Sequence, residues 1–225
     1  MIGIIGAMGV EVDAIKEIIE ERVDKKIGPN KFAVGKINGK DVVVSQCGIG
    51  KVAAAICAQN MIQNFKLDYL LNVGVAGSLS LNLDVCSIAI SSSLVQHDMD
   101  TTPLGDPIGF ISGINIVNIE ADQELVKRIE KAVNTLNLKS EIGVIASGDQ
   151  FINDKAKKDW IKDTFNAIAC EMEGAAVAQT AYVNSVPFCV IRAISDNADD
   201  SSHMDFGEFQ KKAVSNTVEV IKKLI

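Results

Sequence analysis

Three acidic residues stand where an apolar segment meets the start of a helix, and carboxylates in such places can transfer protons or bind hydroxyl groups. Glu173 opens a run of small residues at 175–182, and Asp196 follows the apolar segment 186–194 in a polar loop at 197–202. Because the carboxyl ends of parallel strands meet at one edge of a sheet, we expect these acids to lie near Glu11, which follows the first apolar segment.

Each acid also has an ordinary structural explanation when it is taken alone. The dipole of the helix stabilises an acid such as Glu11 in the first turn, and Asp196 is a suitable cap for a loop. Glu171 and Glu173 are two residues apart, so they cannot share a helix face and at most one should point into a given pocket. The other acid of that pair would then complement the helix N-terminus.

Apolar periodicity predicts the elements that must position these acids. The pattern alternates between strand-like and helix-like segments, which favours a three-layer α/β domain with a central mixed sheet over residues 1–225. Asn38-Gly39 between two apolar segments is a strong hairpin signal, so the sheet should not be purely parallel. We expect strands at residues 2–7, 32–37, 41–47, 69–75, 87–91, 142–146 and 186–194, and helices at 10–21, 52–64, 121–136, 175–182 and 206–224.

The overall composition excludes several classes of partner. The net charge is −7 without a stripe of Lys and Arg, which argues against nucleic acid and anionic membranes and favours a small ligand. The five cysteines are scattered without CxxC spacing, as expected of free thiols in a reducing compartment. The N-terminus lacks a basic signal region, and no apolar run reaches the roughly 18 residues that span a bilayer. We therefore expect a cytoplasmic protein.

Four further motifs carry weaker signals. The glycines at 3–9 lack the spacing of a dinucleotide fingerprint, and 48–51 lacks the remainder of a P-loop. The segment 97–100 offers His and Asp side chains, but His203 is the one other histidine, so hydrogen bonding within a turn is favoured over a metal site. Glycines at 74–78 fit either a simple turn or close approach of the backbone to a ligand.

Together the motifs resemble those of the 5′-methylthioadenosine/S-adenosylhomocysteine nucleosidases, within the purine nucleoside phosphorylase superfamily. The resemblance runs in order along essentially the whole chain. It implies an α/β fold with a central mixed sheet, a homodimer, a role in methionine salvage, and hydrolysis of the adenine–ribose bond with no metal and no cofactor. The matching segments are residues 2–8 with Glu11, 47–53, 147–152, 171–173 and 192–196.

The resemblance also implies roles for three catalytic residues. Asp196 looks like the acid that protonates adenine N7, and Glu11 looks like the base that activates water. Arg192 is similar to the residue that helps hold the water and the acids. Protonation lets adenine leave as a neutral base, while the ribosyl centre becomes oxocarbenium-like. A carboxylate and a held water suit that cationic transition state.

Other residues match the family's substrate-binding positions. Glu173, with Met172, resembles the anchor of the ribose hydroxyls, and Phe151 and Ile152 resemble the platform for adenine. The remaining substrate-binding residues that the resemblance implies are Ile49, Val75, Ala76, Gly77 and Ser195.

Three departures from the family pattern bear on the site. The acids that usually precede the first helix are reduced to Gly9-Val10-Glu11, and Val75 stands where the family commonly has Ser or Thr. Leu104 and Asp106 replace aromatic residues in a segment, from Leu104 to Ser112 (residues 104–112), that should contribute across the dimer interface. That segment would cover the 5′ substituent, so the preferred 5′ group stays open.

Two alternative functions remain. A phosphorylase on the same fold needs an anion site, normally built from arginines near the first and third strands. Neither residues 6–12 nor 72–78 contain an arginine, which favours water over phosphate. The second alternative is a non-catalytic nucleoside-binding protein. Retention of all three acids argues against it.

Overall fold

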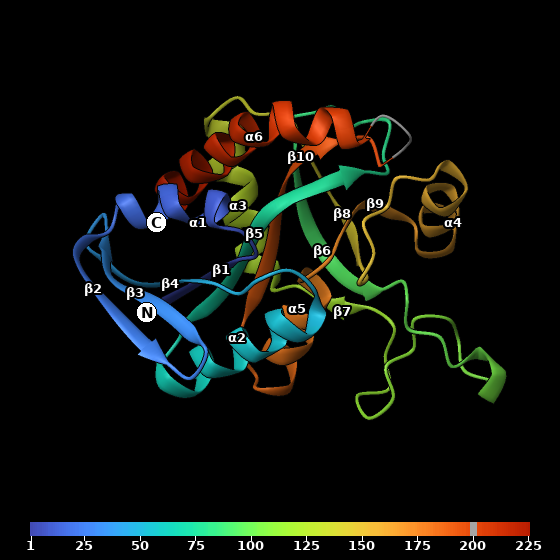
Figure 1. The fold of residues 1–225 in the computed structure, drawn as a ribbon, viewed down its shortest axis with the longest axis horizontal. Coiled ribbons are helices and arrows are strands. Elements are labelled where there is room, and N and C mark those ends of the chain that lie inside the picture. Colours follow the sequence, from blue (N-terminus) through green and yellow to red (C-terminus); the bar gives the residue numbers. More distant parts are fainter. Residues whose placement is uncertain (199–201) are drawn as a thin grey trace.

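A mixed sheet runs through the middle of the molecule, with helices against both of its faces (Figure 1), in the computed structural model, which describes residues 1–198 and 202–225. The strands are β1 (Ile2–Gly6), β2 (Glu20–Ile27), β3 (Asn30–Ile37), β4 (Lys40–Gln46), β5 (Tyr69–Ser78), β6 (Ile88–Gln96), β7 (Ile119–Glu120), β8 (Ser140–Ser147), β9 (Ala167–Glu171) and β10 (Phe188–Asp196). The helices are α1 (Gly9–Glu17), α2 (Lys51–Asn64), α3 (Gln123–Thr135), α4 (Lys155–Phe165), α5 (Gly174–Val183) and α6 (Ser202–Leu224), with a 3₁₀ turn η1 (Thr102–Leu104).

Strand pairing confirms the predicted mixed sheet and closes part of it into a ring. β5 pairs with β10, β10 with β6, β6 with β8, β8 with β9, and β9 returns to β5. From β5 the sheet continues outward through β1, β4, β3 and β2. The pairs around β1 are parallel, whereas those of β2 with β3 and of β3 with β4 are antiparallel.

The β3–β4 hairpin forms where the sequence predicts it. Asn38 and Gly39 take φ angles of 49° and 75° at its tip, as a primed hairpin turn requires. Gly39 adopts that angle without the steric cost that a Cβ would bring.

The helices form two layers. α6 contacts both α1 and α3 on one face of the sheet, and α2 packs on α5 on the other face (Figure 1). α5 is built almost wholly of small residues, so it fits between the sheet and α2 with seven of its ten residues buried. α4 lies at the end of the sheet, where it contacts β8 and β9.

The first helix is shorter than the sequence predicts. It ends at Glu17, and Glu20 and Glu21 begin the edge strand β2 instead. Ile19 turns inward against β3, where Gly35 leaves room: a Cβ on Gly35 would lie 2.5 Å from the Ile19 side chain. Antiparallel pairing with β3 therefore overrides the helical spacing of the apolar residues.

Four elements, the 3₁₀ turn and several boundaries also differ from expectation. β2, β7, α4 and β9 are absent from the predicted set, as is η1, and Asp196 is the last residue of β10 rather than part of a loop. Of the polar loop expected at 197–202, residues 199–201 lie outside the described residues, and Ser202 already belongs to α6. His203 is therefore helical, not in a loop.

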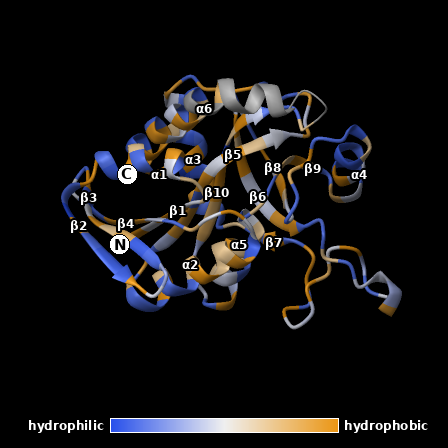
Figure 2. Ribbon diagram, viewed as in Figure 1, coloured by the Kyte–Doolittle hydropathy of each residue, from blue (hydrophilic) through white to orange (hydrophobic). Residues whose placement is uncertain are grey.

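Hydrophobic residues concentrate on the central strands, while β2 is hydrophilic (Figure 2). Charged side chains on an exposed edge strand discourage pairing with another chain. Among the described residues, no helix is both long enough and apolar enough to cross a membrane.

Candidate active site

A cavity opens where β1, β5, β9 and β10 end and where α1 and α5 begin. It encloses about 530 Å³, its open mouth included. Its lining is mostly apolar, with four carboxylates and a serine among the walls. The lining residues are Ala7, Met8, Glu11, Ile49, Val75, Ala76, Gly77, Phe151, Cys170, Glu171, Met172, Glu173, Ser195 and Asp196.

Glu11 reaches into this cavity from α1 and is held by backbone groups of the turn after β1 and of β5. One carboxylate oxygen accepts hydrogen bonds from the N–H groups of Ala7 and Met8, both at 2.8 Å. The other accepts from the N–H of Val75 at 3.1 Å. Burial raises the pKa of Glu11, although the charge of Arg192 and these N–H groups oppose the rise. A buried carboxyl with a raised pKa is suited to accept a proton.

The Val75 contact uses the main chain, so it does not depend on the side chain at that position. The valine side chain has no hydroxyl group, but the Val75 N–H still fixes Glu11. Beside it, Gly74 is required by close approach: a Cβ there would lie 2.7 Å from Glu11 Oε1 and 3.3 Å from Arg192 Nη1. The absence of a side chain at Gly74 thus lets Glu11 and Arg192 lie close to the backbone of β5.

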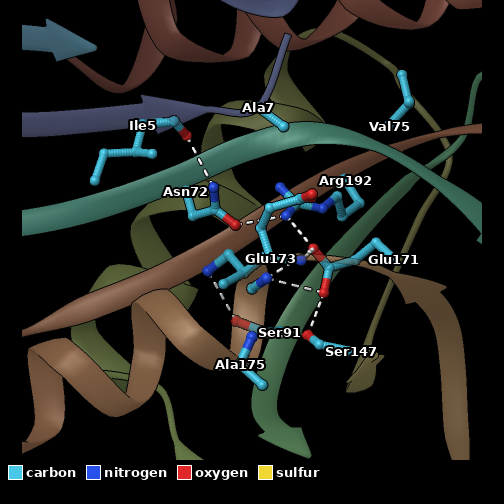
Figure 3. A network of polar contacts seen from close by, with 12 residues as sticks. Ile5, Ala7, Asn72, Val75, Ser91, Ser147, Glu171, Glu173, Ala175 and Arg192 are labelled. Carbon is cyan, nitrogen blue, oxygen red and sulfur yellow. Dashed lines mark hydrogen bonds and ion pairs between the residues drawn. The ribbon is translucent and has the colours of Figure 1, made fainter. Parts of the chain in front are cut away.

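Glu171 and Arg192 form a buried ion pair beneath the cavity (Figure 3). Arg192 also donates to Asn72 Oδ1, and Ser147 Oγ donates to Glu171. The Gly174 N–H donates to both Glu171 oxygens, at 2.9 and 2.7 Å. Burial by itself would raise the pKa of Glu171, but Arg192 and these donors outweigh it and hold the pKa below its ordinary value.

Glu173 differs from Glu171 in having few partners. One of its oxygens accepts from the N–H of Gly50 at 2.8 Å, where α2 begins. Burial, and then the negative charge of Glu171, raise the pKa of Glu173 to about 7. Glu173 therefore faces the cavity as a carboxyl that titrates near neutral pH, while Glu171 is committed to Arg192 and to the start of α5.

Asp196 lines the cavity at the end of β10. Its two oxygens accept from Ser195 Oγ and from the Ala198 N–H, both at 2.8 Å. The carboxylate is buried, and Gly77 of β5 makes room for it, since a Cβ there would lie 2.9 Å from Asp196 Oδ1. Two fixed donors hold Asp196 in one orientation.

The mouth of the cavity carries two large exposed side chains. Ile49 is 61% exposed and Phe151 is 49% exposed. A smaller recess adjoins the cavity and is lined by Gln150 and Ile152. It shares other lining residues with the cavity, among them Phe151, Met172 and Asp196. A flat aromatic base entering between Phe151 and Asp196 would meet both apolar surface and a carboxyl group.

The structure brings almost all of the predicted site residues together. Ile152 lines the adjoining recess, and Arg192 lies beneath the cavity instead of in its wall. The predicted residues that line the cavity itself are Glu11, Ile49, Val75, Ala76, Gly77, Phe151, Met172, Glu173, Ser195 and Asp196.

Sequence reasoning missed four lining residues: Ala7, Met8, Cys170 and Glu171. Ala7 and Met8 directly follow β1, and ligands bind at the carboxyl ends of parallel strands. Their position in the sequence could therefore have indicated that they line the site. Burial raises the pKa of the Cys170 thiol above its ordinary range, so this side chain serves as apolar wall.

In the segment 97–100 the two aspartates form hydrogen bonds, whereas neither ring nitrogen of the buried His97 has a hydrogen-bond partner among the described residues. Asp98 accepts from Lys51 Nζ at 2.6 Å, and Asp100 accepts from the Thr102 N–H at 2.9 Å. Within the described part of the chain, no group of three or more His, Cys, Asp or Glu residues could hold a metal ion.

Comparison with known proteins gives one consistent result. The family model of the phosphorylase superfamily matches residues 1–225. A 5′-methylthioadenosine/S-adenosylhomocysteine nucleosidase of Staphylococcus haemolyticus is 40% identical over 226 residues, covering 100% of this chain and 99% of the relative. The corresponding protein of Staphylococcus aureus is 37% identical with the same coverage.

Solved structures agree in fold. The Neisseria meningitidis nucleosidase in complex with methylthio-immucillin-A superposes with a TM-score of 0.96 at 32% identity, covering 99% of this chain and 97% of that one. A mutant Helicobacter pylori nucleosidase with 5′-methylthioadenosine in its active site gives 0.95 at 37%, covering 99% and 96%. A Helicobacter pylori structure described as futalosine hydrolase gives 0.95 at 36%, covering 99% and 96%. The chain therefore belongs to the phosphorylase superfamily and, within it, to the family of the 5′-methylthioadenosine/S-adenosylhomocysteine nucleosidases.

Proposed function

We propose that this protein hydrolyses the N-glycosidic bond of 5′-methylthioadenosine, S-adenosylhomocysteine and related 5′-substituted adenosines, and releases adenine. The observation that carries the proposal is the arrangement of Glu11, Glu173 and Asp196 around one cavity whose walls are otherwise largely apolar. Relatives that cover the whole chain bear the names of these substrates.

Asp196 is the proposed general acid. Its carboxyl group adjoins the recess of Phe151 and Ile152, where adenine would lie, and Ser195 and Ala198 fix its orientation. Protonation of the base at N7 lets adenine depart uncharged, and a positioned acid of this kind contributes roughly 10²- to 10⁴-fold to the rate.

Glu11 is the proposed general base for water. Its raised pKa and its fixed position between β1 and β5 support the assignment. Glu173 accepts hydrogen bonds from the ribose hydroxyls in this scheme, next to Met172. The residues proposed to line the rest of the substrate site are Ile49, Val75, Ala76, Gly77 and Ser195.

Arg192 acts in this proposal without touching substrate. Its guanidinium is buried and paired with Glu171 and Asn72, and its charge opposes the pKa rise of Glu11 and of Glu173. We assign it to positioning and electrostatic balance of the acids. Among the described residues, no lysine or arginine lines the cavity, which supports water instead of phosphate as the nucleophile.

The test is release of adenine from 5′-methylthioadenosine with and without phosphate. We expect equal rates and a free 5-methylthioribose product. Strict dependence on phosphate with a sugar 1-phosphate product would establish the phosphorylase alternative, and tight binding without any turnover would establish the nucleoside-binding alternative. A parallel panel of S-adenosylhomocysteine, 5′-deoxyadenosine, futalosine and inosine would rank the 5′ groups and bases.

We further propose a cytoplasmic homodimer in which residues 104–112, from Leu104 to Ser112, cover the 5′ group in the partner's site. The chain between β6 and β7 extends away from the sheet (Figure 1), and Leu104 is 82% exposed at its η1 turn. The cavity is open at Ile49 and Phe151, so a cover from outside the chain has a place to dock. Methionine salvage would use the released thiosugar.

Complementation between subunits tests this arrangement. Leu104→Asp should raise KM for 5′-methylthioadenosine, and Asp196→Asn should be nearly inactive. A mixed dimer of the two variants has one site in which both residues are native. With Asp196→Asn in large excess, almost every Leu104→Asp subunit is in a mixed dimer, so the KM of the mixture should return to the wild-type value. A mixture that keeps the high KM of Leu104→Asp, or a protein that runs as a monomer in light scattering, would contradict the proposal.

A further inference from the structure

Three segments outside the cavity wall meet behind its mouth. They are the end of β6 with Asp98, the start of α2 with Lys51, and the loop after β8 with Asp149. Asp98 Oδ1 accepts from Lys51 Nζ at 2.6 Å, and Asp98 Oδ2 accepts from the Asp149 N–H at 2.9 Å. Asp149 Oδ1 in turn accepts from the Lys51 N–H at 2.8 Å. These contacts form a closed ring of three residues.

Two residues of the ring lie close in sequence to residues at the cavity: Lys51 follows Gly50, and Asp149 lies close to Phe151. Gly50, which precedes Lys51, donates its N–H to Glu173 at 2.8 Å. Phe151, two residues after Asp149, lines the cavity mouth. Gly50 has a φ of 95°, and a Cβ on it would lie 3.0 Å from Asp149 Oδ1, so the ring packs directly against the donor of Glu173. The ring therefore lies between the segment that contacts Glu173 and the segment that carries Phe151.

Other contacts hold the ring in place. Gln96 Oε1 accepts from Lys51 Nζ at 3.0 Å, and Gln96 itself donates to Gln179 of α5 at 2.7 Å. The buried His97 ring lies against Gly148, where a Cβ would come within 2.4 Å of it. Burial would raise the pKa of Asp98, but Lys51 and the Asp149 N–H hold the pKa below its ordinary value, so Asp98 stays ionised at neutral pH.

We infer that Asp98 is a positioning residue for substrate binding, which through Lys51 and Asp149 sets the Gly50 donor of Glu173 and the Phe151 platform at their working separation. The inference rests on the proposed function. It concerns binding more than chemistry, because the hydrogen bonds of Lys51, Asp98 and Asp149 do not involve Glu11 or Asp196, whose partners lie in other segments.

Asp98→Asn is the sharpest test, because the side chain keeps its shape. Its NH₂ group would face either Lys51 Nζ or the Asp149 N–H and could not accept a hydrogen bond from that donor. Loss of a hydrogen bond to a charged group corresponds to roughly a 10- to 100-fold effect. We expect KM for 5′-methylthioadenosine to rise by about that factor, with kcat within about threefold of wild type. Asp84→Asn is the matched control, since Asp84 pairs with Lys139 at the same 2.6 Å on the exposed surface.

A second variant separates positioning from a loss of fold. Lys51→Met should also raise KM, and Asp98→Asn should add less in the Lys51→Met background than alone, as residues in one network do. Unchanged KM in Asp98→Asn, full additivity of the two variants, or a fall in kcat at unchanged KM, which is what a smaller folded fraction gives, would overturn the inference. Absence of adenine release by the wild-type protein would instead overturn the proposed function.

Discussion

Arg192 neutralises Glu171, not Glu173, although both acids belong to one short motif. The guanidinium and the Glu171 carboxylate form their ion pair with almost no exposed surface. Glu173 has the Gly50 N–H as its hydrogen-bond donor and a pKa raised to about 7. The pairing therefore separates a structural acid from one that is available to a ligand.

The buried pair should dominate the local stability of the site. Arg192→Met leaves the Glu171 charge buried and uncompensated, and such changes cost roughly 3–5 kcal/mol. Urea unfolding of this variant against wild type measures the loss. Asp84→Asn breaks an exposed ion pair and should have little effect. Equal stability of Arg192→Met and wild type would mean that the pair is not formed.

The raised pKa of Glu173 predicts weaker substrate binding in acid. The ionised carboxylate accepts hydrogen bonds from hydroxyls, and it is the main species only above pH 7, where the cited pKa lies. As the pH falls through 7 the carboxyl becomes protonated, so the dissociation constant for 5′-methylthioadenosine should rise. Well below pH 7 the rise should approach about tenfold for each pH unit.

Calorimetry on Asp196→Asn, in which turnover does not interfere, measures that constant. The double variant Asp196→Asn with Glu173→Gln is the control, and it should bind 5′-methylthioadenosine weakly at every pH from about 5 to about 8. This range covers about one to two pH units around the Glu173 pKa. A dependence on pH that persists in the double variant would assign the titration to another group.

Gly74 should be essential although it carries no side chain. In Gly74→Ala the new Cβ would lie 2.7 Å from Glu11 Oε1, so Glu11 must leave its position between β1 and β5. Displacement of a proposed general base predicts a kcat loss of roughly 10²-fold or more. Gly9→Ala is the control, because the atom nearest to its new Cβ is Oδ2 of the exposed Asp13 side chain at 3.0 Å, which can turn into solvent. Wild-type kcat in Gly74→Ala would remove Glu11 from the mechanism.

Asp196→Asn should separate binding from chemistry. The amide cannot protonate adenine, so kcat should fall by roughly 10²- to 10⁴-fold. Binding of adenine should remain measurable by calorimetry, because Phe151 and Ile152 are untouched. Near-full activity of Asp196→Asn would show that another group protonates the base.

Much of the fold follows from apolar periodicity, and the failures have identifiable causes. β2 has the sequence Glu-Glu-Arg-Val-Asp-Lys-Lys-Ile, which is charged because both the edge and its faces are exposed. β9 is five buried residues with two alanines and a cysteine, so neither length nor β-branched residues mark it. α4 carries four lysines and buries only Ile161 and Phe165, which leaves little apolar spacing to detect.

The motifs single out residues that line one cavity, but they do not reveal how its acids are paired. The spacing of Glu171 and Glu173 indicated that one would serve the helix end, and Glu171 does so through the Gly174 N–H. Its pairing with Arg192 depends on β9 and β10 being brought together through the closed ring of strands, which no local pattern encodes. The same holds for the contacts of Asp98, since they join residues about 50 positions apart.

In the proposed reaction, water is the nucleophile that attacks the ribosyl carbon. Its most direct test is a single-turnover reaction of 5′-methylthioadenosine in ¹⁸O-labelled water containing phosphate, with mass analysis of the sugar product before exchange. We predict 5-methylthioribose carrying one ¹⁸O atom at C1 and no sugar phosphate. A sugar 1-phosphate without the label would contradict the account.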